Sequence, residues 1–357
     1  MKKIGIAIAA FALLLSGASA YNPPAFSENL WNLSSTRNIT GQTSVAGGGT
    51  LGDAVDSIAV NPALTADAQR VALNLGYTAL VTYEPSDADY GSAFQTGILI
   101  PFKMFNFSGM TNIVSFPWLE SSWNFKAGLS KEITAKLSVG ANADFGFAWG
   151  EGSDWAIGAG VGFVYDWGQL AFMPDFRFGA SLLNLGKYYK NDLSGVDNTA
   201  STTNWPSPVT LKAGAAATFY KNDTIDFSAS LDITIPTFQN AIFDLTPKFA
   251  VKDMLYFTLP LSINCLEASK ADDNFYKSGF SAGIGVFFKF DFNVKNNQYL
   301  EKNGWSESEM VASAAYKNLN SSVHAVVANV DVNLGMKDKT PPAIKIWADD
   351  EEDADEE

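Results

Sequence analysis

The sequence predicts an all-β fold, a transmembrane antiparallel β-barrel of about fourteen strands with an N-terminal luminal plug. Three observations lead to this prediction. The chain begins with an export signal, long stretches alternate between apolar and small or polar residues, and aromatic residues gather at the ends of these stretches. Aromatic residues make up 13% of the chain and charged residues only 17%, a balance that suits a barrel better than a soluble domain.

Residues 1–20 (MKKIGIAIAAFALLLSGASA) have the pattern of a cleavable signal peptide. Two lysines precede an apolar run from Ile4 to Leu15, and the segment ends on Ala18-Ser19-Ala20. The apolar run is shorter than the roughly 20 residues that a membrane-spanning helix needs. We therefore expect an exported protein whose mature chain begins at Tyr21 and whose location is the outer membrane.

Alternation typical of strands dominates from Val71 onward. Between Leu137 and Trp149 every second residue is apolar, and Ser, Gly, Asn and Asp lie between. Successive strand side chains face opposite sides, so such a stretch has one apolar and one polar face. The stretches are about as long as the 9 to 11 residues that a tilted strand needs to cross a bilayer. Fourteen candidate strands begin near residues 71, 93, 111, 121, 135, 155, 171, 208, 225, 240, 254, 277, 308 and 322.

The chain thus divides into a signal peptide (1–20), a plug segment (21–70), a barrel (71–336) and an acidic C-terminal tail (337–357) that we expect to be disordered. We expect both ends of the chain on the periplasmic side of the barrel. The net charge is -14, and the run DDEEDADEE at 349–357 carries eight of the negative charges. This acidity argues against a nucleic-acid partner, which requires a basic face.

The segment before the first strand is rich in Gly, Ala and Ser, which allow tight packing inside a barrel. Pro62 fixes a local bend, and Asp53 or Ser57 is a candidate start for a short helical turn. Its Ala46-Gly47-Gly48-Gly49, Asp53-Ala54 and Ala59-Val60-Asn61-Pro62-Ala63-Leu64 resemble the N-terminal hatch of the FadL-like superfamily of long-chain fatty-acid transporters.

A second resemblance to this superfamily lies in FGASLLNLG (178–186), followed by PSPVTLKAG (206–214). The layout is most similar to a spirochaete branch of the superfamily. One departure is the 21-residue tail, since barrels of the family often end on a strand with a terminal aromatic residue.

The resemblance implies passive uptake of hydrophobic compounds such as long-chain fatty acids. Ligand would bind on the outer side, and the hatch residues Asn61, Pro62 and Ala63 would form the gate. The alternative for these three residues is a plain turn. Further alternatives are a structural, secretion-associated or adhesin-like protein without transport activity, and a porin for polar solutes.

A fatty acid needs a cation to pair with its carboxylate. By strand phase, three cations face the lumen and are candidate ligand-binding residues: Arg177, Lys212 and Lys289. Five acids face it by the same rule: Asp144, Asp166, Asp226, Asp232 and Asp291. The favoured interpretation pairs these charges with one another in a wet lumen, with direct ligand contact as the alternative. A register error of one residue would reverse every assignment.

Enzymatic chemistry, a cofactor and a metal site are not expected. The chain has one cysteine, Cys265, and one histidine, His324, too few for a disulfide framework, a zinc cluster or a histidine-based triad. Glycines 158, 160 and 162 recur within a strand pattern, unlike a dinucleotide-binding loop. We expect Asp87, Asp89, Asp272 and Asp273 to be solvated loop charges, with calcium binding as the alternative.

We expect a monomeric barrel whose partners are a hydrophobic small molecule and outer-membrane lipid. The acidic tail is a candidate site for a periplasmic or secretion partner.

Overall fold

The computed structural model describes residues 33–48, 54–82, 90–115, 121–150, 152–187, 209–236, 238, 240–252, 254–269, 279–293, 298–302, 307–320 and 323–335. The predicted signal peptide and acidic tail lie outside the described residues, as do Asp53 and the loop acids Asp87, Asp89, Asp272 and Asp273.

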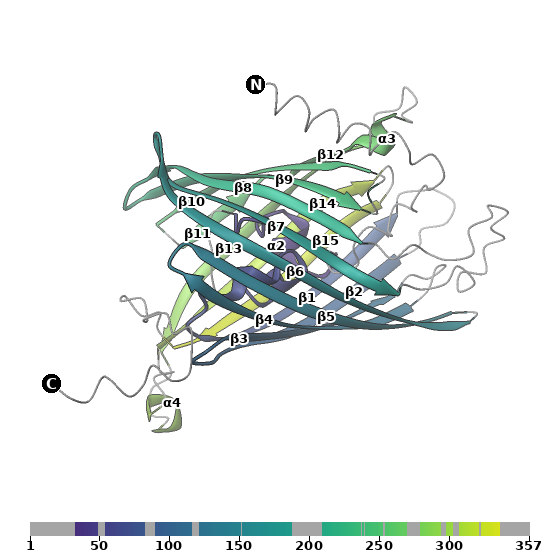
Figure 1. Cartoon of the computed structure of the whole chain (residues 1–357), viewed down its shortest axis with the longest axis horizontal. Coiled ribbons are helices and arrows are strands. Elements are labelled where there is room, and N and C mark those ends of the chain that lie inside the picture. The colour runs from purple at the N-terminus through teal and green to yellow at the C-terminus, as the bar shows by residue number, and fades with distance from the viewer. Residues whose placement is uncertain are drawn as a thin grey trace.

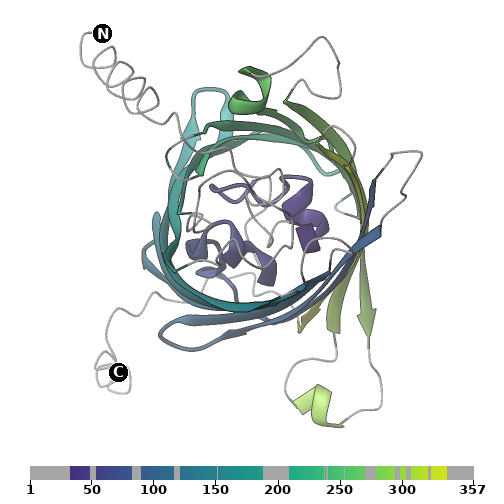
Figure 2. The same cartoon turned by 90° about the vertical axis from the view of Figure 1, so that its right-hand side faces the viewer.

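The strands form one closed antiparallel sheet around the plug (Figures 1 and 2). They are β1 (Val71–Thr82), β2 (Tyr90–Pro101), β3 (Asn106–Ser115), β4 (Ser121–Thr134), β5 (Leu137–Trp149), β6 (Ser153–Leu170), β7 (Met173–Lys187), β8 (Thr210–Lys221), β9 (Ile225–Pro236), β10 (Ile242–Val251), β11 (Leu255–Thr258), β12 (Leu261–Asn264), β13 (Phe280–Asn293), β14 (Glu307–Asn320) and β15 (Val323–Leu334). Pairing of β15 with β1 and of β9 with β10 closes the ring.

The predicted count of fourteen strands is confirmed, because β11 and β12 together occupy one position between β10 and β13. The interruption falls at Leu259 and Pro260, where proline has no N–H to donate to a neighbouring strand. Pairing still passes across the break, since Leu259 N donates to Pro247 O at 3.1 Å and Gly283 N donates to Pro260 O at 3.1 Å. The third strand departs furthest from its predicted start near residue 111, since it begins at Asn106.

The faces of the strands follow the predicted alternation. On β1, Leu73, Leu75 and Tyr77 are exposed on the outer surface, whereas Asn74 and Thr78 are buried against the plug. Large aromatic side chains on the outside include Trp123, Phe147, Trp149, Trp155, Trp167 and Tyr220. An apolar outer band with aromatic residues near its edges is the pattern of a transmembrane barrel.

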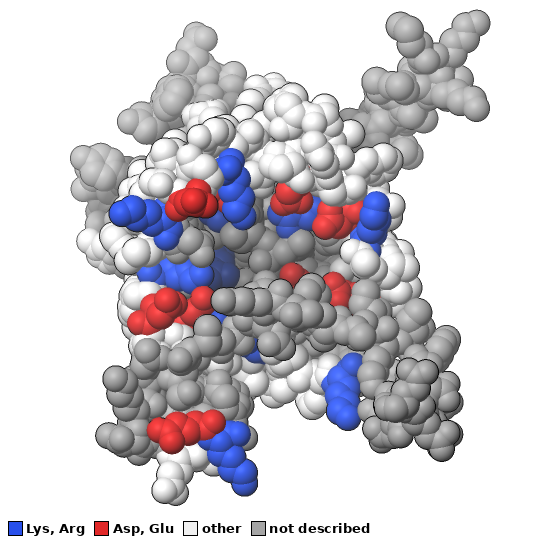
Figure 3. Space-filling view, turned by 90° about the vertical axis from the view of Figure 1, so that its left-hand side faces the viewer, with Lys and Arg blue, Asp and Glu red and all other residues white. Residues whose placement is uncertain are grey.

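The chain enters and leaves the barrel at the same end, because Val71 pairs with Leu334. We call this end the base and the opposite end the top; the base is the predicted periplasmic side. Helix α4 (Gln298–Lys302) lies at the base, and helix α3 (Cys265–Ser269) lies at the top (Figure 1). Charged side chains of both signs surround the base (Figure 3). None of the described helices is long and apolar enough to cross a bilayer.

The described part of the plug lies inside the ring of strands (Figure 2) and includes the short helices α2 (Thr36–Ile39), η2 (Val55–Ala59) and η3 (Pro62–Thr65). Helix α2 packs against β14 and β15, η2 against β1 to β4, and η3 against β4 to β6. The prediction that Ser57 begins a helical turn is wrong, since Ser57 lies within η2, which has no side-chain cap. The capped turn is η3, which begins after Asn61 with Pro62 in its first position.

Candidate functional site: the plug seat and the luminal lysines

Asn61 joins two parts of the plug to the barrel wall. Its side-chain amide Nδ2 donates to Val45 O at 2.8 Å and to Phe163 O of β6 at 2.9 Å, while its Oδ1 accepts from Ala63 N at 3.0 Å. Gly162 lies opposite, and a Cβ built there would come within 2.1 Å of Asn61 Oδ1. A glycine is therefore required at this point of β6 for the amide to reach the wall.

Pro62 and Ala63 lie against a second glycine. A Cβ on Gly140 of β5 would fall 2.4 Å from the Pro62 carbonyl and 2.6 Å from Ala63 N. Ala63 also packs with Leu64 and with Val164 of β6. The structure thus places the three predicted hatch residues together, seated directly on the backbone of the wall.

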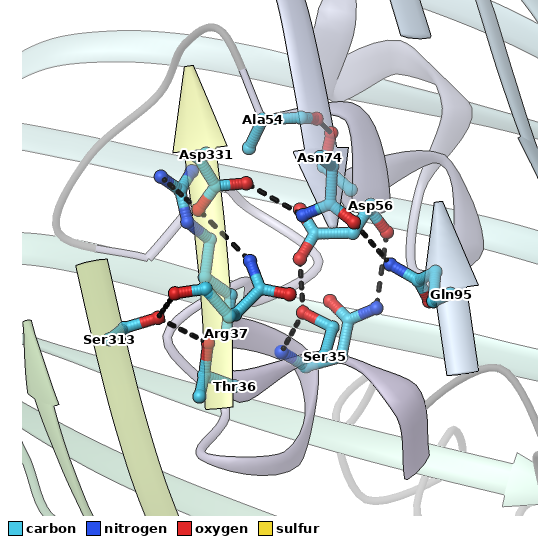
Figure 4. Close-up of polar contacts among 12 residues, drawn as sticks. Ser35, Thr36, Arg37, Ala54, Asp56, Asn74, Gln95, Ser313 and Asp331 are labelled. Carbon is cyan, nitrogen blue, oxygen red and sulfur yellow. Dashed lines mark hydrogen bonds and ion pairs between the residues drawn. The ribbon is translucent and has the colours of Figure 1, made fainter. Parts of the chain in front are cut away.

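A second group of polar and charged side chains joins the plug to β1 and β15 (Figure 4). We call it the latch cluster: Ser35, Arg37, Asp56, Asn74 and Asp331. Arg37 Nη2 lies 3.1 Å from Asp331 Oδ2, Asn74 Nδ2 donates to Asp331 Oδ1 at 2.6 Å, and Ser35 Oγ donates to Asp56 Oδ2.

Two further contacts extend the latch cluster. Gln95 Nε2 donates to Asn74 Oδ1 at 2.8 Å, and the hydroxyls of Thr36 and Ser313 lie 2.6 Å apart. This group could not be predicted from the sequence, because its wall residues Asn74 and Asp331 come from strands at opposite ends of the chain.

Asp56 lies in the plug and is fully buried. Burial and, to a smaller extent, the nearby Asp331 carboxylate raise the pKa of its carboxyl to about 6, against the lowering effect of the Arg37 guanidinium. One of its oxygens, Oδ1, has no hydrogen-bond partner among the described residues. The latch cluster therefore holds one cation between two carboxylates, and the seated plug favours the neutral form of Asp56.

All three predicted luminal cations face the lumen, but two of them are engaged at the base. Arg177 is paired with Asp175 at 3.1 Å, and its Nη2 donates to the plug carbonyl of Gly48 at 3.0 Å. Lys289 is paired with Glu309 at 3.1 Å. For Arg177 and Lys289, the structure favours the interpretation that luminal charges pair with one another.

Lys212 is different because it lies near the top, as the third residue of a strand that begins there. It is buried within electrostatic range of two further lysines, Lys126 and Lys317. We call these three residues the luminal lysines. They lie in the top half of the lumen, the half opposite the predicted periplasmic side.

Carboxylates interleave the luminal lysines. Lys126 Nζ lies 3.3 Å from Asp144 Oδ1, and Lys317 Nζ donates to Ser262 Oγ at 3.0 Å, which in turn donates to Asp244 Oδ1. Lys126 and Lys317 were not among the cations predicted from the sequence to face the lumen. The position of Lys126 between outward Phe125 and Ala127 is a signal that could have identified it.

The predicted luminal acids have separate roles. Asp144 pairs with Lys126, and Asp226 lies 3.9 Å from Lys221. Asp166 accepts from Gly168 N at 2.7 Å within its own turn. Asp232 accepts from the plug amide Val45 N at 2.9 Å. Asp291 is on the inward phase of β13 near the base and is exposed.

The described residues contain no group of three or more His, Cys, Asp or Glu side chains arranged to hold a metal ion. Cys265 is exposed on α3. His324 Nδ1 lies 2.8 Å from the hydroxyl of Tyr316.

Comparison with solved structures shows a shared fold. The CymD monoaromatic hydrocarbon channel superposes with a TM-score of 0.55 at 12% identity, covering 84% of this chain and 97% of that one. The TodX monoaromatic hydrocarbon channel deltaS2 mutant gives 0.53 at 11% identity, covering 86% and 100%. A Pseudomonas aeruginosa FadL homologue gives 0.49 at 10% identity, covering 84% and 98%.

No protein-family model matches the sequence, and no curated protein matches it either. The fold assignment rests on the CymD and TodX channels. This chain therefore has the plugged, fourteen-strand barrel fold of outer-membrane channels.

Proposed function

We propose that this protein is an outer-membrane channel of the FadL-like superfamily for passive uptake of hydrophobic compounds such as long-chain fatty acids, gated by its N-terminal plug. The observation that carries the proposal is the combination of a plug seated across the lumen with three luminal lysines in the top half. Placement in a spirochaete branch stays a prediction.

The luminal lysines favour an anionic head group over a neutral hydrocarbon. A carboxylate gains charge-assisted hydrogen bonds from ammonium groups, each worth about 1.5–3 kcal/mol. Among the three predicted cations, Lys212 is the best candidate to bind the ligand carboxylate, because Arg177 and Lys289 are already paired at the base. The proposed ligand is thus an amphiphile with a carboxylate head near Lys212.

Uptake of labelled oleate by proteoliposomes tests this proposal, with Lys212→Met as the variant and Lys289→Met as the matched luminal control. We expect saturable uptake by the wild type. Loss of one charge-assisted hydrogen bond should raise the half-saturating concentration about tenfold for Lys212→Met. The Lys289→Met channel should stay close to the wild type, since that lysine is engaged with Glu309.

Labelled toluene serves as the neutral comparison. Uptake of toluene without oleate would replace the fatty acid by a neutral hydrocarbon as the substrate class. If neither compound enters above empty liposomes, the transport proposal fails. The structural, secretion-associated or adhesin-like alternative would then be tested by copurification with periplasmic and surface complexes.

A further inference from the structure

Asp331 of the latch cluster sets the orientation of three amide side chains in the wall. Asn74 Nδ2 donates to its Oδ1 at 2.6 Å, and Asn329 Nδ2 donates to its Oδ2 at 3.2 Å. Gln95 Nε2 donates in turn to Asn74 Oδ1 at 2.8 Å (Figure 4). Because an ionised carboxylate only accepts hydrogen bonds, each amide turns its N–H₂ group toward Asp331. The chain of hydrogen bonds therefore ends on the amide oxygens of Gln95 and Asn329, which can only accept.

These two oxygens have no donor in the described part of the chain. Gln95 and Asn329 are buried, and neither Gln95 Oε1 nor Asn329 Oδ1 has a hydrogen-bond partner there. Asp56 of the plug, which is buried within electrostatic range of Asp331, also has an oxygen without a partner, Oδ1. Buried polar atoms in proteins nearly always have a partner. Three such acceptors in one region therefore indicate a bound group that the chain itself does not supply.

Gly76 of β1 lies between the two wall amides. It pairs with Gln95 on one side and with Asn329 on the other, so the three residues form one row that faces the lumen. A Cβ on Gly76 would lie 2.3 Å from Asn329 Oδ1 and 2.5 Å from the carbonyl oxygen of Ser34 in the plug. An oxygen of the wall and an oxygen of the plug thus converge where glycine has no side chain. We call the following four oxygens the acceptor site: Ser34 O, Asp56 Oδ1, Gln95 Oε1 and Asn329 Oδ1.

The charges around the acceptor site favour a cation over a water molecule. Asp56 and Asp331 are two carboxylates with one guanidinium, that of Arg37, so one negative charge remains when both are ionised. A buried charge without a counter-charge is strongly disfavoured. A water molecule donates only two hydrogen bonds and needs a donor for its own oxygen, whereas a cation binds several oxygens at once. Amide, carbonyl and carboxylate oxygens are the ligands that hard cations take, and a single excess charge matches a monovalent ion.

We propose that the acceptor site binds a monovalent cation, Na⁺, which joins the plug to the wall. Two of the four oxygens belong to the plug and two to strands β2 and β15, so the site is complete only when the plug is seated. A ligand that binds only the seated form stabilises that form. The inference concerns the seat of the plug and does not depend on which compound the channel transports.

The experiment measures hydrogen exchange of amides in residues 33–48 in nanodiscs, in NaCl and in choline chloride. The ionic strength is the same in both salts, so charges are screened equally. The measurement is made at pH 8, where Asp56, whose pKa burial raises to about 6, is ionised. We expect opening to be about tenfold rarer at a Na⁺ concentration about ten times the Kd. A sodium NMR titration should show one saturable site per barrel. Equal opening in the two salts would overturn the proposal and assign the four oxygens to water.

Asn329→Leu removes one acceptor at similar side-chain size. Asn142→Leu is the matched control, because Asn142 is also a buried wall amide whose Oδ1 has no partner and whose Nδ2 donates to a plug carbonyl, that of Ile58. Each variant is compared with itself in the two salts, so the hydrogen bond that it loses cancels. The Na⁺ effect should disappear in Asn329→Leu and persist in Asn142→Leu. A full effect in Asn329→Leu, or its loss in both variants, would contradict the site.

Asp56→Asn keeps an acceptor oxygen at the site and removes the charge. We expect this variant to bind Na⁺ about tenfold more weakly than the wild type, since affinity follows the charge of the ligands. An unchanged Kd would show that the excess charge does not attract the ion and would overturn the proposal. Folding of each variant is checked by the heat-dependent shift in electrophoretic mobility that closed barrels show.

Discussion

Strands β3 to β6 hold the plug with uncharged groups, whereas β9 and β15 hold it with charged ones. Asn106 of β3 donates to Thr65 O at 2.8 Å, Ser130 of β4 lies 2.7 Å from the Thr65 hydroxyl, and Asn142 of β5 donates to Ile58 O at 3.0 Å. On the other side, Asp232 and Asp331 bind the plug through carboxylates.

The contacts with β3 to β6 are therefore insensitive to charge, whereas the contacts with β9 and β15 respond to it. Neutral hydrogen bonds change little when an anion or a proton arrives, but a buried carboxylate changes its free energy strongly with its counter-charge. A plug that moves in response to ligand or pH would therefore pivot on the side of β3 to β6 and release on the side of β9 and β15.

Breaking the charged side should have the largest effect. Arg37→Met leaves the buried Asp331 without its cation, and such a loss costs about 3–5 kcal/mol. Hydrogen exchange of amides in residues 33–48 should show the opening free energy reduced by that amount. Lys126→Met breaks a buried ion pair that lies only in the wall and is the control. Equal exchange in Arg37→Met and the wild type would mean that the latch cluster does not hold the plug.

Breaking the neutral side should have a smaller effect. Asn61→Ala removes the cap of η3 and the hydrogen bonds to Val45 O and Phe163 O, a loss of about 3 kcal/mol. Exchange of amides in residues 54–66 should report it. Asn61→Ser keeps a capping oxygen, adds no charge and loses the donors to Val45 O and Phe163 O, so it should recover about 1 kcal/mol of the loss. A wild-type exchange rate in Asn61→Ala would support the plain-turn interpretation.

The smallest expected effect is a pH dependence confined to the charged side. Burial raises the pKa of Asp56 to about 6, so the seated plug binds this proton more tightly than an exposed carboxyl does. The stabilisation is complete below the ordinary pKa and is lost as pH rises through the raised value. Between pH 5 and pH 7 the opening of residues 33–48 should increase about tenfold beyond the intrinsic exchange rate, and Asp56→Asn should abolish this increase. An unchanged pH profile in Asp56→Asn would assign the titration to another group.

Much of the barrel could be predicted because alternation is a local property. Leu137 to Trp149 shows its apolar and polar faces within one strand, and the same phase places Lys212 inside. The start of η3 was also present in the sequence, since Asn61-Pro62 is a cap followed by proline at the first helical position. Its role as a cap was missed in favour of Asp53 or Ser57. The latch cluster could not be found in this way, because Arg37 meets Asp331 only when β15 closes against β1.

The sequence by itself determined which side chains point into the lumen, because the pleat of a strand assigns faces without reference to the rest of the fold. Arg177, Lys212 and Lys289 are equivalent on that basis. Only the tertiary structure separated them, placing Arg177 against Gly48, Lys289 against Glu309 and Lys212 near the top among lysines from β4 and β14. The partner of a charge inside a barrel comes from distant strands and from the plug, so it is decided by register and closure rather than by local pattern.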